Sequence, residues 1–293
     1  MATSSWPQGL IDTHVHTAPD VLPRKLTDLE LAREATDAGH RAIVLKSHHS
    51  LTVTRASVVA EALGGGTQIF GGVVLNLHAT GGFNAYAVRT ALELGARVVW
   101  MPTFTSANHV HSLATDPRSE SLRALGEIDG PGISVLDDQG NLESHVLETI
   151  DLIAAHGATL ATGHLGAREI LALVPEARRR GVERIIVTHP ELPCVSLPID
   201  AQLQLAQDGG VWFERVGMMA HESGADLGRI LEAIRVVGTE STIMATDLGQ
   251  PHNPSPVVGM HTYVQQVRDA GFSQDDVELM ACVSPAAALG LSS

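Results

Sequence analysis

Aromatic side chains and positive charge are both scarce in this chain of 293 residues. Phenylalanine, tyrosine and tryptophan together make up 3%, and the formal net charge is −14. Binding to a nucleic acid needs cationic side chains against the phosphates, and single strands also need rings that stack on the bases. The composition therefore argues against nucleic acid as a partner.

Cysteine and long apolar runs are also rare. The two cysteines, Cys194 and Cys282, have no spacing typical of a metal or redox motif, so we expect no disulfide framework and a reducing compartment. No run approaches the roughly 18 apolar residues that a membrane span requires, and residues 1–9 do not resemble a signal peptide. These absences predict a cytoplasmic protein without a membrane partner.

Aliphatic residues are plentiful, because hydrophobic residues make up 44% of the chain. Short β-branched runs occur at 10–12, 42–45, 69–75, 97–101, 158–161, 184–187, 211–213 and 242–245. Amphipathic stretches of helical period lie between them, at 26–38, 53–63, 85–94, 143–155, 167–179, 226–236 and 257–270. Eight alternating units predict an α/β fold whose parallel strands close into a (β/α)₈ TIM barrel, as a single domain over residues 1–293.

One long segment interrupts this alternation after the fourth predicted strand. Residues 105–132 are polar and contain several glycine and proline breakers. The short apolar run 133–136 and the turn at 137–141 then suggest a small hairpin before the next helix. We interpret 105–141 as an inserted lid or pocket wall.

Imidazoles and a carboxylate gather at four of the predicted strand ends, which meet at the mouth of a barrel. His14 and His16 follow the first strand, His164 the fifth, His189 the sixth and Asp247 the eighth. Residues two apart on an extended chain point the same way, so His14 and His16 both face the mouth. A hydrolytic metal centre needs such ligands around one point, with an open position for water. The set predicts a metal centre.

The strand-end residues resemble the amidohydrolase superfamily of metal-dependent barrel enzymes. The resemblance rests on the run Asp12-Thr13-His14-Val15-His16 and on His164, His189 and Asp247, and it extends from residue 9 to residue 291. Residues 283–291 are also similar to the asparagine-proline-alanine helix near the end of many members, with Ser284 in the asparagine position.

The resemblance implies one or two divalent ions and a catalytic carboxylate. It implies that His14, His16 and Asp247 bind one ion, with His164 and His189 on the same or a second ion. Zn²⁺ is the first expectation, with Mn²⁺ or Fe²⁺ as alternatives. Such an ion lowers the pKa of bound water from roughly 15.7 to about 7. The resemblance also implies that Asp247 takes the proton from that water and passes it to the leaving group.

Lys46 is a departure from the superfamily pattern. Many two-metal members carry a carboxylated lysine at the end of the fourth strand, but residues 100–104 contain no lysine. Lys46 instead follows the second strand, where burial of an ammonium group is costly. Three interpretations stay open: it pairs with a carboxylate or the substrate, it is carboxylated and bridges two ions as a metal ligand, or it is a positive anchor beside one ion.

Further polar residues near the predicted mouth are candidates for substrate binding: His48, Asn76, His78, His109, His111, Arg215 and His252. His109 and His111 repeat the spacing of the first pair but lie in the polar loop after the fourth strand, so we predict a substrate or lid contact. Arg215 would bind a substrate carboxylate through two hydrogen bonds, or else form an ion pair with Glu214 or another barrel acid.

These features predict a metal-dependent hydrolase that uses activated water on a small cyclic amide, lactone, ester or amide. A non-oxidative decarboxylase or lyase of the same barrel type is one alternative, and a metal- or ligand-binding barrel without turnover is another. The expected partners are the small-molecule substrate and further copies of the chain in a homo-oligomer.

Overall fold

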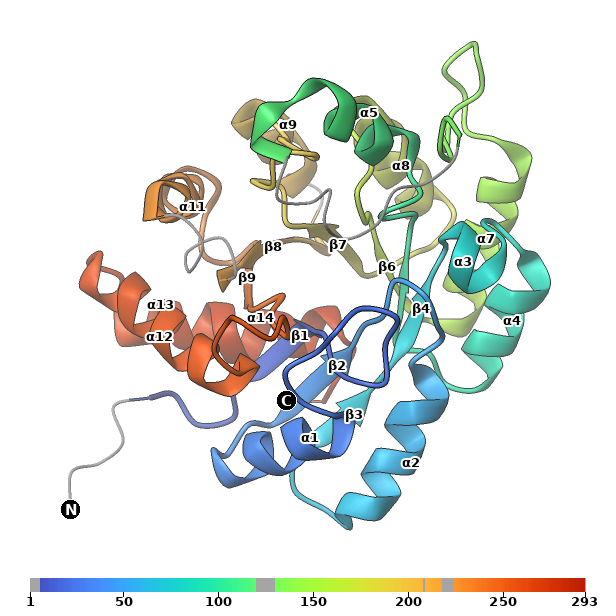
Figure 1. Cartoon of the computed structure of the whole chain (residues 1–293). Coiled ribbons are helices and arrows are strands. Elements are labelled where there is room, and N and C mark those ends of the chain that lie inside the picture. The colour runs from blue at the N-terminus through green and yellow to red at the C-terminus, as the bar shows by residue number, and fades with distance from the viewer. Residues whose placement is uncertain (1–5, 120–129, 208, 218–223, 293) are drawn as a thin grey trace, which may run out of the picture.

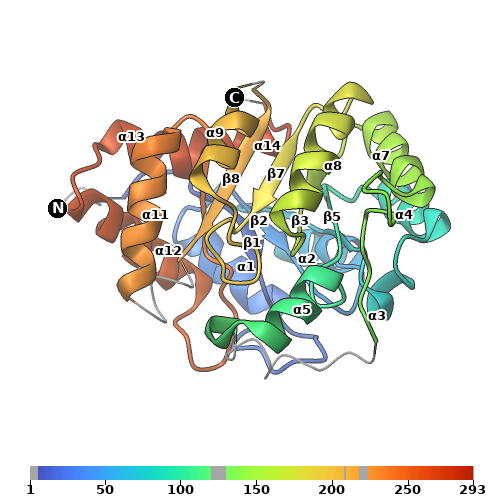
Figure 2. The same cartoon turned by 90° about the horizontal axis from the view of Figure 1, so that it is seen from above.

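Parallel strands form the centre of the molecule and helices surround them (Figures 1 and 2). The computed structural model describes residues 6–119, 130–207, 209–217 and 224–292. The strands are β1 Ile11–Val15, β2 Ala42–Leu45, β3 Gln68–Phe70, β4 Gly72–Val74, β5 Val98–Trp100, β6 Thr159–Ala161, β7 Ile185–Thr188, β8 Val211–Val216 and β9 Thr242–Ala245. All ladder pairs are parallel, in the order β1-β2-β3 and β4-β5-β6-β7-β8-β9.

The helices that follow the strands agree closely with the amphipathic stretches. The outer helices are α1 Asp28–Asp37, α2 Val53–Leu63, α4 Ala85–Glu93, α7 Ser144–His156, α8 Ala167–Arg179, α11 Gly224–Val237 and α12 Pro256–Asp269. Shorter segments are α3 Leu77–Thr80, α5 Ala107–Thr115, η1 Pro117–Ser119, α9 Ile199–Ala206, α13 Gln274–Glu278, η2 Leu279–Val283 and α14 Ser284–Ala288. Among the described residues, no helix is long and apolar enough to cross a membrane.

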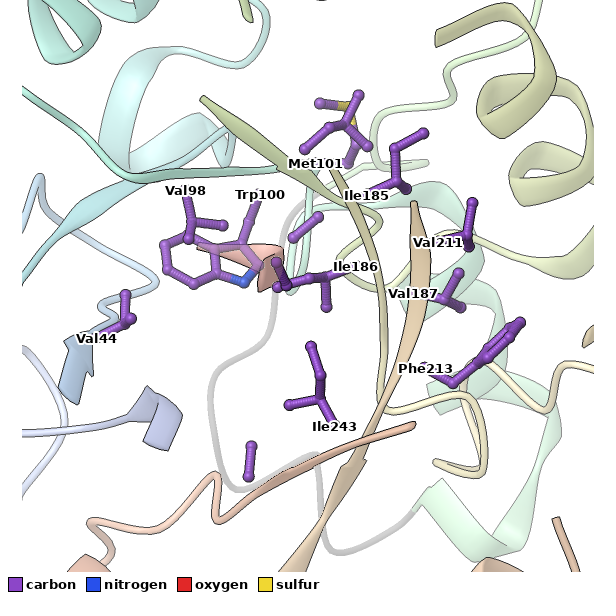
Figure 3. Packing of buried hydrophobic residues seen from close by; sticks show 14 of the residues in the cluster. Val44, Val98, Trp100, Met101, Ile185, Ile186, Val187, Val211, Phe213 and Ile243 are labelled. Atoms are coloured by element: carbon purple, nitrogen blue, oxygen red, sulfur yellow. The ribbon is translucent and has the colours of Figure 1, made fainter. Parts of the chain in front are cut away.

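Strands β2, β5, β7 and β9 are buried on both faces, which explains their continuous apolar sequences. Figure 3 shows side chains from several strands packed together, among them Trp100, Ile186 and Ile243. Each of these side chains is at most 1% exposed. Full burial of one aliphatic side chain contributes about 1.5–3 kcal/mol, so this layer is a main source of stability.

The third strand of the barrel is bent and divides into β3 and β4 at Gly71. A Cβ atom on Gly71 would lie 2.4 Å from the carbonyl oxygen of Thr52, so only glycine fits there. The Thr52 hydroxyl accepts from the amide of Gly72 at 2.9 Å and donates to the carbonyl of Leu45 at 2.7 Å. The single strand predicted at 69–75 is therefore present as two segments, β3 paired with β2 and β4 with β5.

β9 lies beside β1 at the seam where the first and last strands of the barrel meet. The amide of Asp247 donates to the carbonyl of His14 at 2.9 Å, and the amide of His16 donates to that of Leu248 at 2.8 Å. The buried carboxylate of Asp12 accepts from the amide and the hydroxyl of Thr246, at 3.1 and 2.6 Å. This seam holds the ends of the first and last strands together.

The inserted segment differs from the expected loop and hairpin. Residues Ala107–Thr115 form the helix α5, begun by Ser106, whose hydroxyl accepts from the amide of His109. The expected hairpin is reduced to one antiparallel bridge between Leu136 and Leu142. Residues 120–129 of the proposed lid lie outside the described residues.

Candidate metal centre

His14, His16 and Asp247 bring three potential ligand atoms together at the seam between β1 and β9. The Nε2 atoms of the two histidines are 3.3 Å apart. Asp247 Oδ1 lies 2.9 Å from His14 Nε2 and 3.0 Å from His16 Nε2. Ligand atoms of a tetrahedral zinc ion are about 3.3 Å apart, because zinc–nitrogen bonds are about 2.0–2.1 Å long. The donor set therefore fits a divalent ion.

Glu214, on β8, orients the ring of His14. Its Oε2 atom accepts from His14 Nδ1 at 3.0 Å, and its Oε1 atom accepts from the Thr13 hydroxyl at 2.6 Å. A proton on Nδ1 leaves the lone pair of Nε2 directed at the centre, which is the tautomer a metal requires. From the sequence we considered Glu214 as an alternative ion-pair partner of Arg215. Glu214 lies on the strand before that of Asp247 and faces the barrel mouth, and this position was the signal that it could orient His14.

Burial and neighbouring charges set the protonation of the three ligands. Burial lowers the pKa of His16 to about 3, aided by Arg24, so His16 is neutral. Burial also acts to lower the pKa of His14, but the carboxylates of Asp247 and Glu214 outweigh it and raise that pKa. Burial acts to raise the pKa of Asp247, yet the nearby histidines hold it well below its usual range. Two carboxylates facing His14 favour a cation at this point.

The backbone at this centre is strained at two ligand candidates. His189 and Asp247 have φ angles of 29° and 54°, in the left-handed region that residues other than glycine rarely adopt. Such conformations cost about 1–3 kcal/mol each and persist where the surroundings impose them. At Asp247, the hydrogen bond from its amide to His14 is one such constraint.

Lys46 lies beside the ligands on β2's carboxyl end. Its Nζ atom is 3.0 Å from His14 Nε2, and it is 1% exposed. Among the described residues, no carboxylate forms a salt bridge with it, although the carboxylates of Asp247 and Glu214 are close enough to act on its pKa, so a pairing with a protein carboxylate stays a prediction. Burial lowers the pKa of Lys46 to about 8. A carboxylated lysine, a positive anchor and a contact with the substrate stay predictions.

His164 and His189 lie next to this centre but make different contacts. The ring centroid of His189 is 6.0 Å from that of His14 and 4.9 Å from that of His164. Among the described residues, His189 Nδ1 is buried without a hydrogen-bond partner. His164 instead faces His109, with 2.8 Å between the two Nδ1 atoms, and these residues cluster with Cys194. No sequence spacing pointed to Cys194, because it lies in a turn after β7 and not at a strand end.

His164 owes its position to Gly163. Gly163 has a φ of 59°, and a Cβ atom there would lie 2.4 Å from the carbonyl oxygen of Met101. The sharp turn lets the amide of His164 donate to the carbonyl of Pro102 at 3.0 Å. The end of β6 is thereby fixed against the end of β5.

Two of the predicted substrate-binding residues lie close to the centre. His48 is buried, stacks on His16 with ring centroids 4.9 Å apart, and bonds the Thr103 hydroxyl through Nδ1 at 2.8 Å. Asn76 uses its whole amide within the protein: Nδ2 donates to the carbonyl of His48 and the hydroxyl of Thr103, and Oδ1 accepts from the amides of Thr103 and Thr105. The amide of Asn76 thus holds the ends of neighbouring strands together, and the substrate contacts predicted for Asn76 and His48 stay predictions.

His109 and His111 lie on α5 and not in a loop, which corrects the prediction. Residues two apart on a helix are rotated by about 200°, so their side chains diverge. His109 is 1% exposed and faces His164, whereas His111 is exposed. The same spacing of two residues therefore directs His14 and His16 to one side of a strand, but directs His109 and His111 to different sides of a helix. A substrate contact of His111 stays a prediction.

Arg215 points away from the barrel mouth and pairs with Glu191, which agrees with the predicted alternative of an ion pair with another acid and not with the predicted contact to a substrate carboxylate. Adjacent residues of a strand point to opposite faces, and Glu214 occupies the inward position. The guanidinium of Arg215 is fully buried, contacts Glu191 closely, and donates to Gln202 Oε1 at 3.0 Å. Its partners lie on α9 and on the turn after β7, so Arg215 joins the strand to the outer layer.

His78 and His252 lie on the surface. His78 is on α3, with its ring centroid 6.1 Å from that of His49. His252 is exposed in the turn that follows β9. Substrate binding by these two residues stays a prediction.

The chain matches the sequence profile described as "Family of unknown function (DUF6282)" over residues 9–214. A comparison with curated proteins gave no match.

Solved structures share the whole barrel. An amidohydrolase from Pseudomonas aeruginosa is 14% identical, with a TM-score of 0.66 over 96% of this chain and 95% of that one. A Xaa-Pro dipeptidase is 15% identical, with a TM-score of 0.61 over 97% and 75% of the two chains. A 2,6-dihydroxybenzoate decarboxylase is 10% identical, with a TM-score of 0.55 over 97% and 100%. At these identities the likeness shows the fold alone, and it confirms the predicted TIM barrel.

Proposed function

We propose that this chain, which belongs to the family of unknown function DUF6282, is a metal-dependent hydrolase acting on a small cyclic amide, lactone, ester or amide. The observation that carries the proposal is the compact triangle of His14 Nε2, His16 Nε2 and Asp247 Oδ1, with sides of 2.9–3.3 Å. A fold shared with an amidohydrolase and a dipeptidase supports it.

The residues of the triangle would hold one divalent ion, Zn²⁺ or alternatively Mn²⁺ or Fe²⁺. Such an ion would lower the pKa of bound water and polarise the carbonyl group that is attacked. Glu214 keeps the proton of His14 on Nδ1, and neutral His16 offers its Nε2 lone pair. His189 adds a further buried imidazole at the edge of the site.

Asp247 is the proposed proton acceptor. Its side chain is 10% exposed, against 0% for His14 and 2% for His16, so it is the member of the triangle that a substrate can reach. Its low pKa keeps the carboxylate ionised at neutral pH. Oδ1 faces the histidines, which leaves Oδ2 to take a proton from water and return it to the departing nitrogen or oxygen.

Lys46 fits a second candidate function, that of a non-oxidative decarboxylase, as well as it fits a hydrolase. A buried cation without a carboxylate partner within salt-bridge distance, among the residues that the structure describes, is suited to a carboxylate of the substrate. Both a decarboxylase and a hydrolase of carboxylated substrates would use such an anchor. The nature of the product distinguishes the two.

The test is turnover by the full chain before and after removal of metal with a chelator. The substrates are a panel of lactones, cyclic amides, esters and linear amides, with hydroxybenzoates assayed for carbon dioxide. We expect hydrolysis that chelation abolishes and Zn²⁺ or Mn²⁺ restores. Full activity in a preparation shown to be metal-free refutes the proposal. Release of carbon dioxide without hydrolysis favours the decarboxylase, and metal binding without any turnover favours a binding barrel.

A further inference from the structure

We propose that His109, His164 and Cys194 form a second metal site, which binds Zn²⁺ beside the centre described above. Their potential ligand atoms all lie within 4.8 Å of one another. The three side chains are 1%, 3% and 3% exposed, so the cluster is screened from solvent. They come from α5, the turn after β6 and the turn after β7, and this site does not depend on the proposed hydrolase activity.

The spacing of the two imidazoles is close to that of zinc ligands. His109 Nδ1 and His164 Nδ1 are 2.8 Å apart, so one ring donates a hydrogen bond to the other. Two nitrogen ligands of a tetrahedral zinc ion are about 3.3 Å apart. A movement of about half an ångström, together with a shift of the shared proton from Nδ1 to Nε2 of the donating ring, thus converts this hydrogen bond into a pair of metal ligands.

Hydrogen bonds from the start of α5 hold the backbones of the three residues together. Asn108 Nδ2 donates to the carbonyl of His164 at 3.0 Å and also contacts the carbonyl of Cys194. The Ser106 hydroxyl donates to the same carbonyl of His164 and accepts from the amide of His109, both at 3.0 Å. The cluster therefore has a framework that does not rely on the imidazole and thiol groups themselves.

The donor types determine which ion the site prefers. Burial lowers the pKa of His109 to about 4 and that of His164 well below its usual range, so both rings are neutral donors. Burial raises the pKa of the Cys194 thiol to about 12, so Cys194 would bind as a thiolate only when the ion displaces its proton, which then passes to solvent. Thiolate with imidazole suits zinc and cobalt, whereas Mn²⁺ prefers oxygen ligands. The carboxylate of the first centre accepts the harder ions.

Phe104 and His189 lie between the two sites. The ring centroid of Phe104 is 3.7 Å from that of His48, on the side of the first centre, and 5.4 Å from that of His109. His189 lies between His164 and the first centre, as described above. This arrangement gives two neighbouring ions with separate ligand sets.

Metal titration of the chelated full-length protein tests the proposal. We expect two equivalents of Zn²⁺ or Co²⁺ but one of Mn²⁺, and a thiolate-to-cobalt charge-transfer band with Co²⁺. Cys194→Ser should lose this band and one equivalent of zinc. The matched control is Cys282→Ser, because Cys282 is the other cysteine and is not part of the cluster; it should keep both.

Two further variants separate this site from the first. His109→Gln should lose the second equivalent while its melting curve shows that it is folded, and His16→Ala should keep the cobalt–thiolate band. The proposal is overturned by a wild-type protein without the band, by a band that survives in Cys194→Ser, or by its loss in Cys282→Ser. Loss of the band in a folded His16→Ala variant overturns the claim of separate ligand sets.

Discussion

Glu214→Gln changes one buried carboxylate into an amide of nearly the same shape, directly behind a proposed metal ligand. Glu214 accepts one hydrogen bond from His14 Nδ1 and one from Thr13. The amide can present its oxygen to only one of these two donors. When its NH₂ group faces His14, it favours a proton on Nε2, which is the wrong tautomer for a metal.

The expected effect is a 10- to 100-fold loss of metal affinity, or about 1.4–2.7 kcal/mol, as is typical when a residue behind a histidine ligand is replaced. The tenfold value is expected when the amide oxygen faces His14, because only the negative charge of the carboxylate is then lost. The hundredfold value corresponds to the reversed amide and the wrong tautomer. The carboxylate itself adds to this loss, because it contributes negative charge close to the cation.

Competition with a chromophoric chelator measures the dissociation constant of the first site. A matched control is Glu169→Gln, because Glu169 is also a buried carboxylate but accepts from the backbone amides of Val135 and Gly166 on the outer layer. We expect the control to bind the ion as wild type does. An unchanged dissociation constant in Glu214→Gln would show that this hydrogen bond does not set the orientation of His14 for metal binding.

Other variants test the remaining parts of the argument. His14→Ala or His16→Ala should lose the first metal and the activity while the circular dichroism spectrum keeps its shape; full metal occupancy in both would contradict the assignment to β1. Asp247→Asn should lower kcat at least about 100-fold with metal still bound, because general bases contribute about 10²–10⁴-fold, and a wild-type kcat at full occupancy would make Asp247 a spectator. Arg215→Ala should lower the free energy of unfolding by about 3–5 kcal/mol, measured by urea denaturation, because it leaves the carboxylate of Glu191 buried and unpaired; a loss below about 1 kcal/mol would contradict the importance of this pair.

The sequence predicted the barrel and the first ligand group because both follow from local patterns. β-branched runs mark the strands, and a parallel barrel brings every strand's carboxyl end to one face. The positions of His14, His16 and Asp247 relative to their strands therefore determined where their side chains meet. The bend at Gly71 was not predicted, because it depends on the close approach of Thr52 from another unit of the barrel.

The errors arose where side-chain direction depended on an element's type or on a tertiary partner. Arg215 follows Glu214 directly, so strand periodicity allowed only one of the two to face the mouth. The helix α5 carries large apolar side chains only at Val110 and Leu113, and its cap at Ser106 was a further signal that its sequence offered. Cys194 could not be associated with His109 from the sequence, because their proximity depends on how the turn after β7 packs against α5.

The seam between β1 and β9 also determines when the first centre can exist during synthesis. His16 and Asp247 are 231 residues apart in the chain, and the contact between Asp12 and Thr246 spans 234. A ribosome adds about 5–20 residues per second, so roughly 10–50 s pass between the first ligands and the last. Throughout that interval the nascent chain carries two histidines that lack their carboxylate partner.

Closure of this seam is the step that creates a binding site for an ion. An ion present at 100 times its dissociation constant, and bound only by the closed barrel, stabilises that form by about 2.7 kcal/mol. The supply of metal would then stabilise barrels whose first and last strands have joined, relative to barrels in which these strands are still apart.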